Sequence, residues 1–264
     1  MKRLLRTTLS ELAYRAIRMT DGHHTGLRLL TYHRVTDAHP QDRLCVGVSR
    51  FAEQMRYLSE AGFKTVSFAQ AVQWVRGHNR PAPKSIVLTF DDGFEDNYLC
   101  AASAMAPYGF RGCFFVPSAF VESGAPGCEP DDRPMSVAQL EELLRQGHEI
   151  GAHSVTHVKL TTVPQARMVE EVRDSKAALE QALRRPVDFF CYPAGDYDEA
   201  VRRAVCESGY HGACTVEPGA NVPGDDPFTL KRTEISAEDS MRDFERKLAG
   251  AYDWLHRAVQ WSKS

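Results

Sequence analysis

Short apolar runs alternate with amphipathic helical patterns along most of this chain, and this alternation constrains the fold more than any other feature. The apolar runs have the length and composition of buried strands and lie at 27–32, 64–68, 85–90, 112–117, 148–153, 188–193 and 210–215. The segments with helical patterns lie between them, at 50–62, 69–77, 96–109, 136–147, 163–184 and 198–208. Strands that alternate with helices form parallel sheets with right-handed crossovers. Because no linker divides these units, we expect one α/β domain, and their number favours a barrel over an open sheet.

The composition is that of an ordinary globular protein. Of the 264 residues, 43% are hydrophobic and 25% are charged, and the net charge of −3 gives no reason to expect a nucleic-acid partner. The seven cysteines contain no C-x-x-C pair, and Cys113 and Cys191 lie inside apolar runs. This usage favours buried thiols in a reducing compartment over a disulfide framework.

The N-terminal segment 1–22 has the pattern of an amphipathic helix with basic residues around its apolar face. It lacks the uninterrupted apolar core of a signal peptide, and no window reaches the ~20 apolar residues of a membrane span. We therefore expect an N-terminal helix (1–22), a main domain (23–238) and a C-terminal helix packed on the barrel (239–264). We expect a cytoplasmic protein, whose residues 1–20 either contact the inner membrane face peripherally or dock on the chain's own domain.

Two adjacent carboxylates, Asp91 and Asp92, follow the apolar run 85–90 and precede Gly93. Neighbouring side chains on a strand point to opposite faces, so this pair suits a strand end, where glycine permits a turn. On these residues alone, a solvated turn and a functional pair of acids are both open.

The stretch H-S-V-T-H places His153 and His157 four residues apart after another predicted strand. If the backbone turns helically there, both imidazoles lie on one side and can share a metal ion. In a parallel barrel, the carboxyl ends of the strands meet at one rim, which brings these histidines near the two aspartates. Two histidines and one carboxylate suit zinc or another divalent ion, and the second aspartate can then take a proton from water.

The pairing of F-D-D-G with H-S-V-T-H resembles the polysaccharide deacetylases with the NodB-homology domain, carbohydrate esterase family 4, over roughly residues 27–235. The resemblance implies a distorted (β/α)7 barrel of the NodB-homology type that removes acetyl groups from N-acetylated sugars with the help of a metal. It further implies that Asp92, His153 and His157 bind the metal, most simply zinc and alternatively cobalt or nickel, and that Asp91 is the general base.

The third motif of this family is altered here. The stretch C-Y-P-A-G supplies Tyr192, for which the resemblance implies a contribution to oxyanion stabilisation through the backbone around it, but the arginine that often precedes the proline is missing. Arg232 is the candidate that replaces it in orienting the base, and a surface arginine after a strand is the alternative.

The Leu-x-x-His motif that supplies the family's general acid is also absent in its usual form. His33 directly follows the run 27–32. This position resembles the rearranged order of poly-β-1,6-N-acetylglucosamine deacetylases, in which an early Tyr-His takes the role of the acid, and histidine can protonate a leaving amine near neutral pH. We therefore expect His33 to be the general acid, with His256 as the alternative.

Together these features predict a metal-dependent deacetylase that acts on an N-acetylglucosamine-type unit of a polysaccharide or lipid-linked glycan. Two alternatives remain open. The same ligand set can hydrolyse another C–N bond, such as that of a formamide or a cyclic imide, or the barrel can bind glycans without catalysis.

Overall fold

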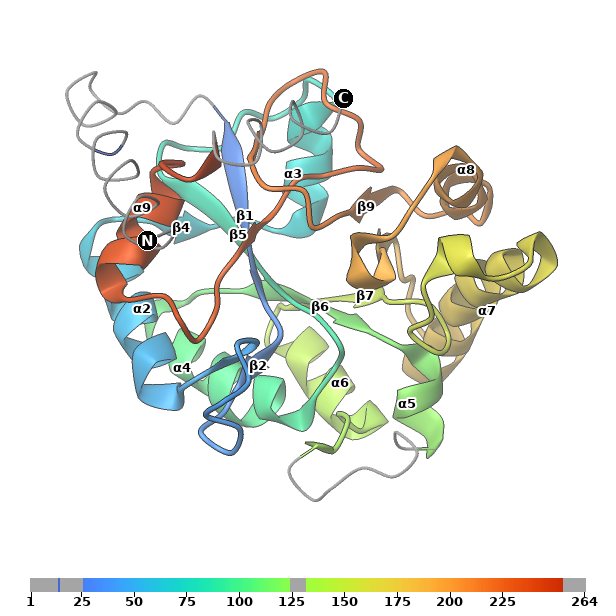
Figure 1. Cartoon of the computed structure of the whole chain (residues 1–264), viewed down its shortest axis with the longest axis horizontal. Helices are drawn as coiled ribbons and strands as arrows, with labels where there is room; N and C mark the ends of the chain where they lie inside the picture. Colours follow the sequence, from blue (N-terminus) through green and yellow to red (C-terminus); the bar gives the residue numbers. More distant parts are fainter. Residues whose placement is uncertain (1–13, 15–25, 124–131, 254–264) are drawn as a thin grey trace.

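The computed structural model describes residue 14, residues 26–123 and residues 132–253. Figure 1 shows a curled sheet at the centre of the molecule with helices around it. The main strands run parallel in chain order: β1 (Leu27–Tyr32), β5 (Ser85–Phe90), β6 (Gly112–Val116), β7 (Glu149–Ala152), β8 (Phe189–Cys191) and β9 (Gly212–Cys214). The bounds of β1 and β5 coincide with the predicted runs, and the other four differ by no more than two residues at either end.

The segment after β9 closes the sheet into a ring. Leu230 forms a parallel bridge with Cys214 of β9, and β11 (Thr233–Glu234) then pairs in parallel with β1. β10 (Ala220–Asn221) adds an antiparallel partner at the start of β1. The result is the distorted (β/α)7 barrel in a single domain that the resemblance implied.

The strand expected at 64–68 is shorter than predicted, because a helix begins inside it. β4 (Lys64–Thr65) pairs with β5, and α3 (Phe68–Val75) starts after the N-cap Ser67, which forms a capping box with Gln70. A further short pair, β2 (Arg34–Val35) with β3 (Cys45–Val46), follows β1.

Alternation along the strands divides the core into two layers. One set of strand side chains, including Leu29, Val87 and Phe115, points into the barrel and packs against α3. The other set, including Leu30 and Phe190, points outward. The outward set lies under the helices that surround the sheet in Figure 1: α2 (Val48–Glu60), α6 (Val137–Arg145), α7 (Gln165–Leu183) and α8 (Glu199–Glu207).

Two helical predictions needed correction. The continuous helix expected at 96–109 is broken into a π-helical turn, η1 (Asn97–Ala102), followed by α4 (Ser103–Met105) and a 3-10 turn, η2 (Ala106–Tyr108). The helix expected at 239–264 begins as α9 (Met241–Leu248) and is interrupted after it, because the chain turns at Gly250 with a φ of 76°. Asp253 is helical again, and residues 254–264 lie outside the described part. Another short helix, α5 (Ser118–Ser123), was not anticipated.

Most of the predicted terminal helices, and His256, lie outside the described residues. Within the described part, the hydroxyl of Tyr14 donates a hydrogen bond to Glu245 of α9 over 3.4 Å. The boundaries proposed at residues 22 and 238 therefore stay predictions.

Candidate metal centre with an adjacent acid and base

The register of the barrel gathers the predicted site residues at one rim. β1 and β5 end in register, and so do β6 and β7. The residues that directly follow three of these strands are His33, Asp91 and His153. Because inward and outward side chains alternate, all three continue the inward-facing series of their strands.

A left-handed turn separates the two aspartates. Asp92 has a φ of 68° and Gly93 a φ of 71°, so the chain leaves the strand directly after Asp91. A side chain at position 93 would also meet Val116 at 2.8 Å, which leaves room only for glycine. The turn allows Asp91 to face the barrel interior while Asp92 faces the two histidines.

Asp92, His153 and His157 form a compact cluster of potential metal ligands. Oδ1 of Asp92 lies 3.1 Å from Nε2 of His157 and 3.4 Å from Nε2 of His153. One ligand atom from each of the three residues lies within 4.8 Å of the other two. Burial would raise the pKa of Asp92, but the two imidazoles beside it lower that pKa below its usual range.

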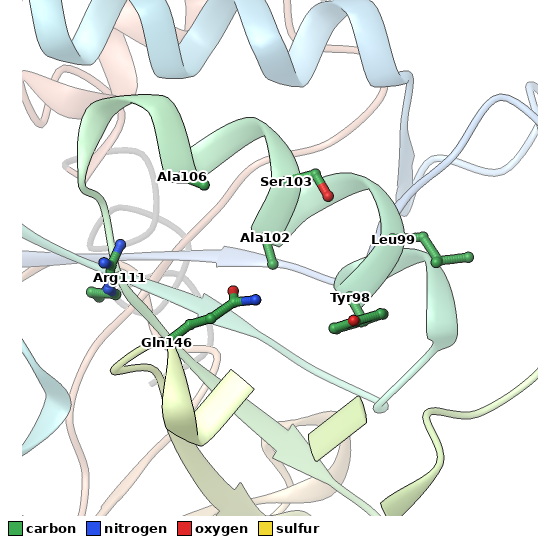
Figure 2. Close-up of a pocket in the computed structure, with 7 residues that line it drawn as sticks. All are labelled: Tyr98, Leu99, Ala102, Ser103, Ala106, Arg111 and Gln146. Carbon is green, nitrogen blue, oxygen red and sulfur yellow. The ribbon is translucent and has the colours of Figure 1, made fainter. Parts of the chain in front are cut away.

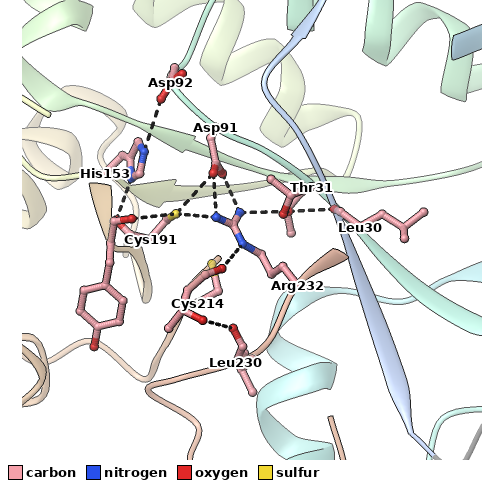
Figure 3. Close-up of polar contacts among 12 residues, drawn as sticks. Leu30, Thr31, Asp91, Asp92, His153, Cys191, Cys214, Leu230 and Arg232 are labelled. Carbon is pink, nitrogen blue, oxygen red and sulfur yellow. Dashed lines mark hydrogen bonds and ion pairs between the residues drawn. The ribbon is translucent and has the colours of Figure 1, made fainter. Parts of the chain in front are cut away.

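The surroundings of this cluster fit a divalent cation. Nδ1 of His153 lies 2.7 Å from the carbonyl oxygen of Cys191, which can only accept, so Nδ1 carries the proton and Nε2 is available as a ligand (Figure 3). Oδ1 of Asp92 is buried, and the two imidazole nitrogens lie close to it without the geometry of a hydrogen bond. A carboxylate oxygen and two imidazole nitrogens that converge in this way form a donor set typical of zinc.

The two histidines come together without the helical turn that was considered from their spacing. Residues 153–157 form a bend in which Ser154 and His157 have left-handed φ values of 60° and 59°. The N–H of His157 donates to Oγ of Ser154 over 3.0 Å, and the N–H groups of Val155 and Thr156 donate to Glu171 on α7. Glu171 had not been anticipated, because nothing in the sequence near 153–157 indicates an acceptor from the following helix.

Arg232 lies against the predicted base. Its Nη1 and Nη2 each donate to one carboxylate oxygen of Asp91 over 2.7 Å, and both side chains are almost fully buried (Figure 3). Burial would raise the pKa of Asp91, but the charge and hydrogen bonds of Arg232 outweigh it, so the pKa lies below its usual range. Arg232 is fixed in turn, since Nε donates to the carbonyl oxygen of Thr215 over 2.7 Å.

Buried thiol and hydroxyl groups complete the surroundings of this pair. Sγ of Cys191 lies 3.1 Å from Nη2 of Arg232 and 3.6 Å from Oδ2 of Asp91. Nη1 of Arg232 also donates to the hydroxyl of Thr89 over 3.2 Å. The guanidinium that contacts the thiol at position 191 comes from the segment directly before β11.

His33 and Asp91 are connected by Asn97, which had also not been anticipated. The side-chain amide of Asn97 donates to the carbonyl oxygen of His33 over 3.0 Å and approaches that of Asp91 at 3.5 Å. Asn97 is fully buried at the start of the π-helical turn η1, a type of distortion that is frequent at functional sites. Nδ1 of His33 is buried without a hydrogen-bond partner in the described part of the chain.

Tyr192 is placed differently from the other candidates. Its side chain belongs to the outward series of β8, is fully buried, and donates its hydroxyl to the carbonyl oxygen of Phe228 over 3.0 Å. Its backbone N–H donates to the carbonyl oxygen of Cys214 over 3.2 Å. The side chain therefore packs on the outer layer and does not join the metal-ligand cluster, and a backbone contribution to oxyanion binding stays a prediction.

A pocket of about 430 Å³ lies elsewhere on the molecule (Figure 2). It is lined by residues of η1, α4 and their neighbours: Tyr98, Leu99, Ala102, Ser103, Ala106, Arg111 and Gln146. None of these residues belongs to the ligand cluster or to the Asp91–Arg232 pair.

The fold and the ligand cluster define a barrel protein with a potential metal site at one rim, and the comparisons with known proteins identify its family. The polysaccharide deacetylase family model matches residues 78–213, which is about half of the chain. The chain therefore belongs to the polysaccharide deacetylase family. The match includes Asp91, Asp92, His153 and His157 but not His33 or Arg232.

Individual relatives agree with this assignment. YxkH of Bacillus subtilis (strain 168) is 25% identical over 210 residues, which are 80% of this chain and 71% of YxkH. Poly-β-1,6-N-acetyl-D-glucosamine N-deacetylase of Escherichia coli (strain K12) is 24% identical over 265 aligned positions, which cover 85% of this chain but only 39% of the enzyme. The structure of the Streptococcus pyogenes deacetylase PplD in complex with acetate superposes with a TM-score of 0.77 at 21% identity, covering 84% of this chain and 98% of PplD, and supports the fold.

Proposed function

We propose that this protein is a metal-dependent deacetylase that hydrolyses the N-acetyl amide of an N-acetylglucosamine-type sugar. The observation that carries the proposal is the juxtaposition of two carboxylates with separate partners. Asp92 faces His153 and His157, whereas the adjacent Asp91 is paired with Arg232. A single turn thus provides a metal ligand and a proton acceptor side by side.

Asp92, His153 and His157 would hold the divalent ion, with zinc as the first choice and cobalt or nickel as alternatives. When bound, such an ion polarises the acetyl carbonyl and lowers the pKa of a coordinated water. Nδ1 of His153 is already fixed by the carbonyl oxygen of Cys191, so the ring needs no reorientation to present Nε2.

Asp91 is suited to accept a proton from the attacking water. Its lowered pKa keeps it ionised at neutral pH, and each of its oxygens accepts only one hydrogen bond from Arg232, which leaves lone pairs for the water proton. Arg232 fixes the plane of the carboxylate and compensates its buried charge.

His33 is the proposed donor of the proton that the departing amine requires. It follows β1 at the same rim as Asp91, and Asn97 contacts the carbonyl oxygens of both residues. A proton on the amine nitrogen converts it into a good leaving group, so that the C–N bond breaks and acetate and a free amino sugar result.

The substrate class is proposed from the family and from the name of the E. coli relative, which acts on a β-1,6-linked N-acetylglucosamine polymer. We propose an N-acetylglucosamine-type unit within a polysaccharide or a lipid-linked glycan. Acetate release from β-1,6-linked N-acetylglucosamine oligomers tests this directly. Zinc-loaded wild type should release acetate, and Asp91→Asn should be slower by at least about 100-fold. Equal rates in the two proteins would contradict the proposed base.

The cellular location stays a prediction. In the part of the chain that the structure describes, no helix is long and apolar enough to cross a membrane. We propose a cytoplasmic enzyme whose residues 1–20 contact the inner membrane face through their basic surface. Deletion of residues 1–20 should abolish co-sedimentation with vesicles rich in anionic lipid, and unchanged co-sedimentation would contradict this contact.

A further inference from the structure

Glu171 lies on α7, and its carboxylate reaches the loop that follows β7 and carries His157. Oε2 accepts the N–H groups of Val155 and Thr156 over 2.9 and 2.8 Å. Oε1 accepts the hydroxyl of Thr156 over 2.6 Å. The carboxylate is only 1% exposed, so these groups largely replace water around it.

The carboxylate remains charged in this position. Nε and Nη2 of Arg167, one helical turn earlier, donate to Oε1 over 3.0 and 2.7 Å. Burial would raise the pKa of Glu171, but the hydrogen bonds from Thr156 and the contact with Arg167 lower it below the usual value. An ionised acceptor makes shorter and stronger hydrogen bonds than a neutral one.

The loop that Glu171 binds has an unfavourable backbone conformation. Ser154 and His157 both have left-handed φ values near 60°, which residues with a side chain rarely adopt unless the surroundings hold them there. The other hydrogen bonds of the loop involve its first residues or lie within it: the carbonyl oxygens of Ser154 and Val155 accept N–H groups of Ser118 and Ala119, and the N–H of His157 donates to Oγ of Ser154. Glu171 therefore supplies the acceptor from another element for the two residues directly before His157.

We propose that Glu171 is a positioning residue for His157 and thereby sets the affinity of the chain for its divalent ion. This role rests on the proposed function, because it assumes that His157 is a metal ligand. The carboxylate holds residues 155 and 156 so that Nε2 of His157 stays 3.1 Å from Oδ1 of Asp92. Groups that orient metal ligands in this way typically change metal affinity by 10- to 100-fold when they are replaced.

The substitution Glu171→Gln is a sharp test, because glutamine has the same shape but one oxygen fewer. Its amide nitrogen would face either the two backbone N–H groups or the guanidinium of Arg167 beside the hydroxyl of Thr156. Backbone N–H and guanidinium groups can only donate, so either orientation sets donor against donor. Glu170→Gln is the matched control, because Glu170 is the exposed neighbour on the same helix. Thr156→Val removes only the hydrogen bond that the hydroxyl of Thr156 donates to Oε1 of Glu171. Because position 156 is exposed, this substitution serves as the milder second variant.

The experiment titrates the full-length, chelator-treated chain with Co²⁺ alone and measures binding by the absorbance of the bound ion. The melting temperature of each metal-free protein is measured separately. We expect Glu171→Gln to raise the Kd by about 10- to 100-fold, Thr156→Val by about fivefold, and Glu170→Gln by less than about twofold. Equal Kd values for Glu171→Gln and Glu170→Gln, with or without a lower melting temperature, would overturn the positioning role. Should Glu171→Gln not fold, a wild-type Kd in Thr156→Val would overturn it. A wild-type chain that binds no Co²⁺ would instead contradict the proposed function, and this role with it.

Discussion

Replacing Arg232 by methionine should destabilise the metal-free protein more than any surface substitution. The side chains of Arg232 and Asp91 are 1% and 3% exposed and are joined by two hydrogen bonds of 2.7 Å. Methionine fills much of the same volume but leaves the carboxylate of Asp91 buried without its counter-charge. Loss of one partner from a buried ion pair costs about 3–5 kcal/mol of unfolding free energy, and we expect a loss in this range.

The assay is urea unfolding of the chelator-treated protein at pH 7, with Arg232→Met, Asp91→Asn and the double variant compared in one cycle. The double variant should be more stable than the sum of the single losses implies, by about 2 kcal/mol, because neither charge is then left unpaired. Arg203→Met, at an exposed position on α8, is the control and should change stability by less than about 0.5 kcal/mol.

The stabilisation that the Asp91–Arg232 pair contributes should decrease as the pH falls. The pKa of Asp91 is lowered in the folded protein, so the stability contributed by the pair is present above the usual value of 3.8 and is lost as the pH falls. The difference in stability between wild type and Arg232→Met should therefore shrink as the pH is lowered from 5 towards 3. A difference that is independent of pH, or an Arg232→Met variant as stable as Arg203→Met, would refute the reasoning.

Three further predictions concern single side chains. His33→Gln should lower kcat by about 100- to 10,000-fold with little change in KM, measured by acetate release, and an unchanged kcat would exclude His33 as the acid. His148 is buried and accepts the N–H of Gly112 at Nδ1, and burial lowers its pKa to about 4. A tenfold change in proton affinity is worth about 1.4 kcal/mol, so the free energy of unfolding should fall by up to about 3 kcal/mol as the pH drops from 6.5 to 4. In thermal melts, the stability of His148→Gln should depend much less on pH over this range. Tyr192→Phe removes only the hydrogen bond to Phe228, so it should cost about 1 kcal/mol in urea unfolding and leave acetate release unchanged; a large loss of activity would show that the hydroxyl acts in catalysis.

The strand pattern made the fold largely predictable. Buried parallel strands are continuous apolar runs, and the bounds of β1 and β5 could be read directly from theirs. The end of α9 was harder to predict, because Phe244, Leu248 and Tyr252 keep the spacing of one helical face. Tyr252 is buried even though the chain has already turned at Gly250. Spacing of apolar residues reports burial, and burial does not require that the helix continue.

The site was predictable where strand ends determine it and unpredictable where a distant side chain does. Asp91 and His153 follow strands, so parallel pairing alone brings them to one rim. The bend at 153–157 depends on Glu171, which lies on the next helix and contacts the loop only in the folded chain. Asn97 was overlooked for a similar reason, since a buried amide within a helical pattern gives no sign of the two carbonyl groups that it approaches.

The central claim is that Asp92, His153 and His157 bind a catalytic divalent ion, and metal content tests it most directly. Wild type and Asp92→Ala should be purified gently in parallel, without chelator, and analysed for zinc, cobalt and nickel per folded chain. We expect about one ion per wild-type chain and a large loss in Asp92→Ala, with both proteins folded by circular dichroism. A folded wild-type protein that stays empty even when metal is supplied, or an Asp92→Ala variant that binds as much as wild type, would contradict the claim.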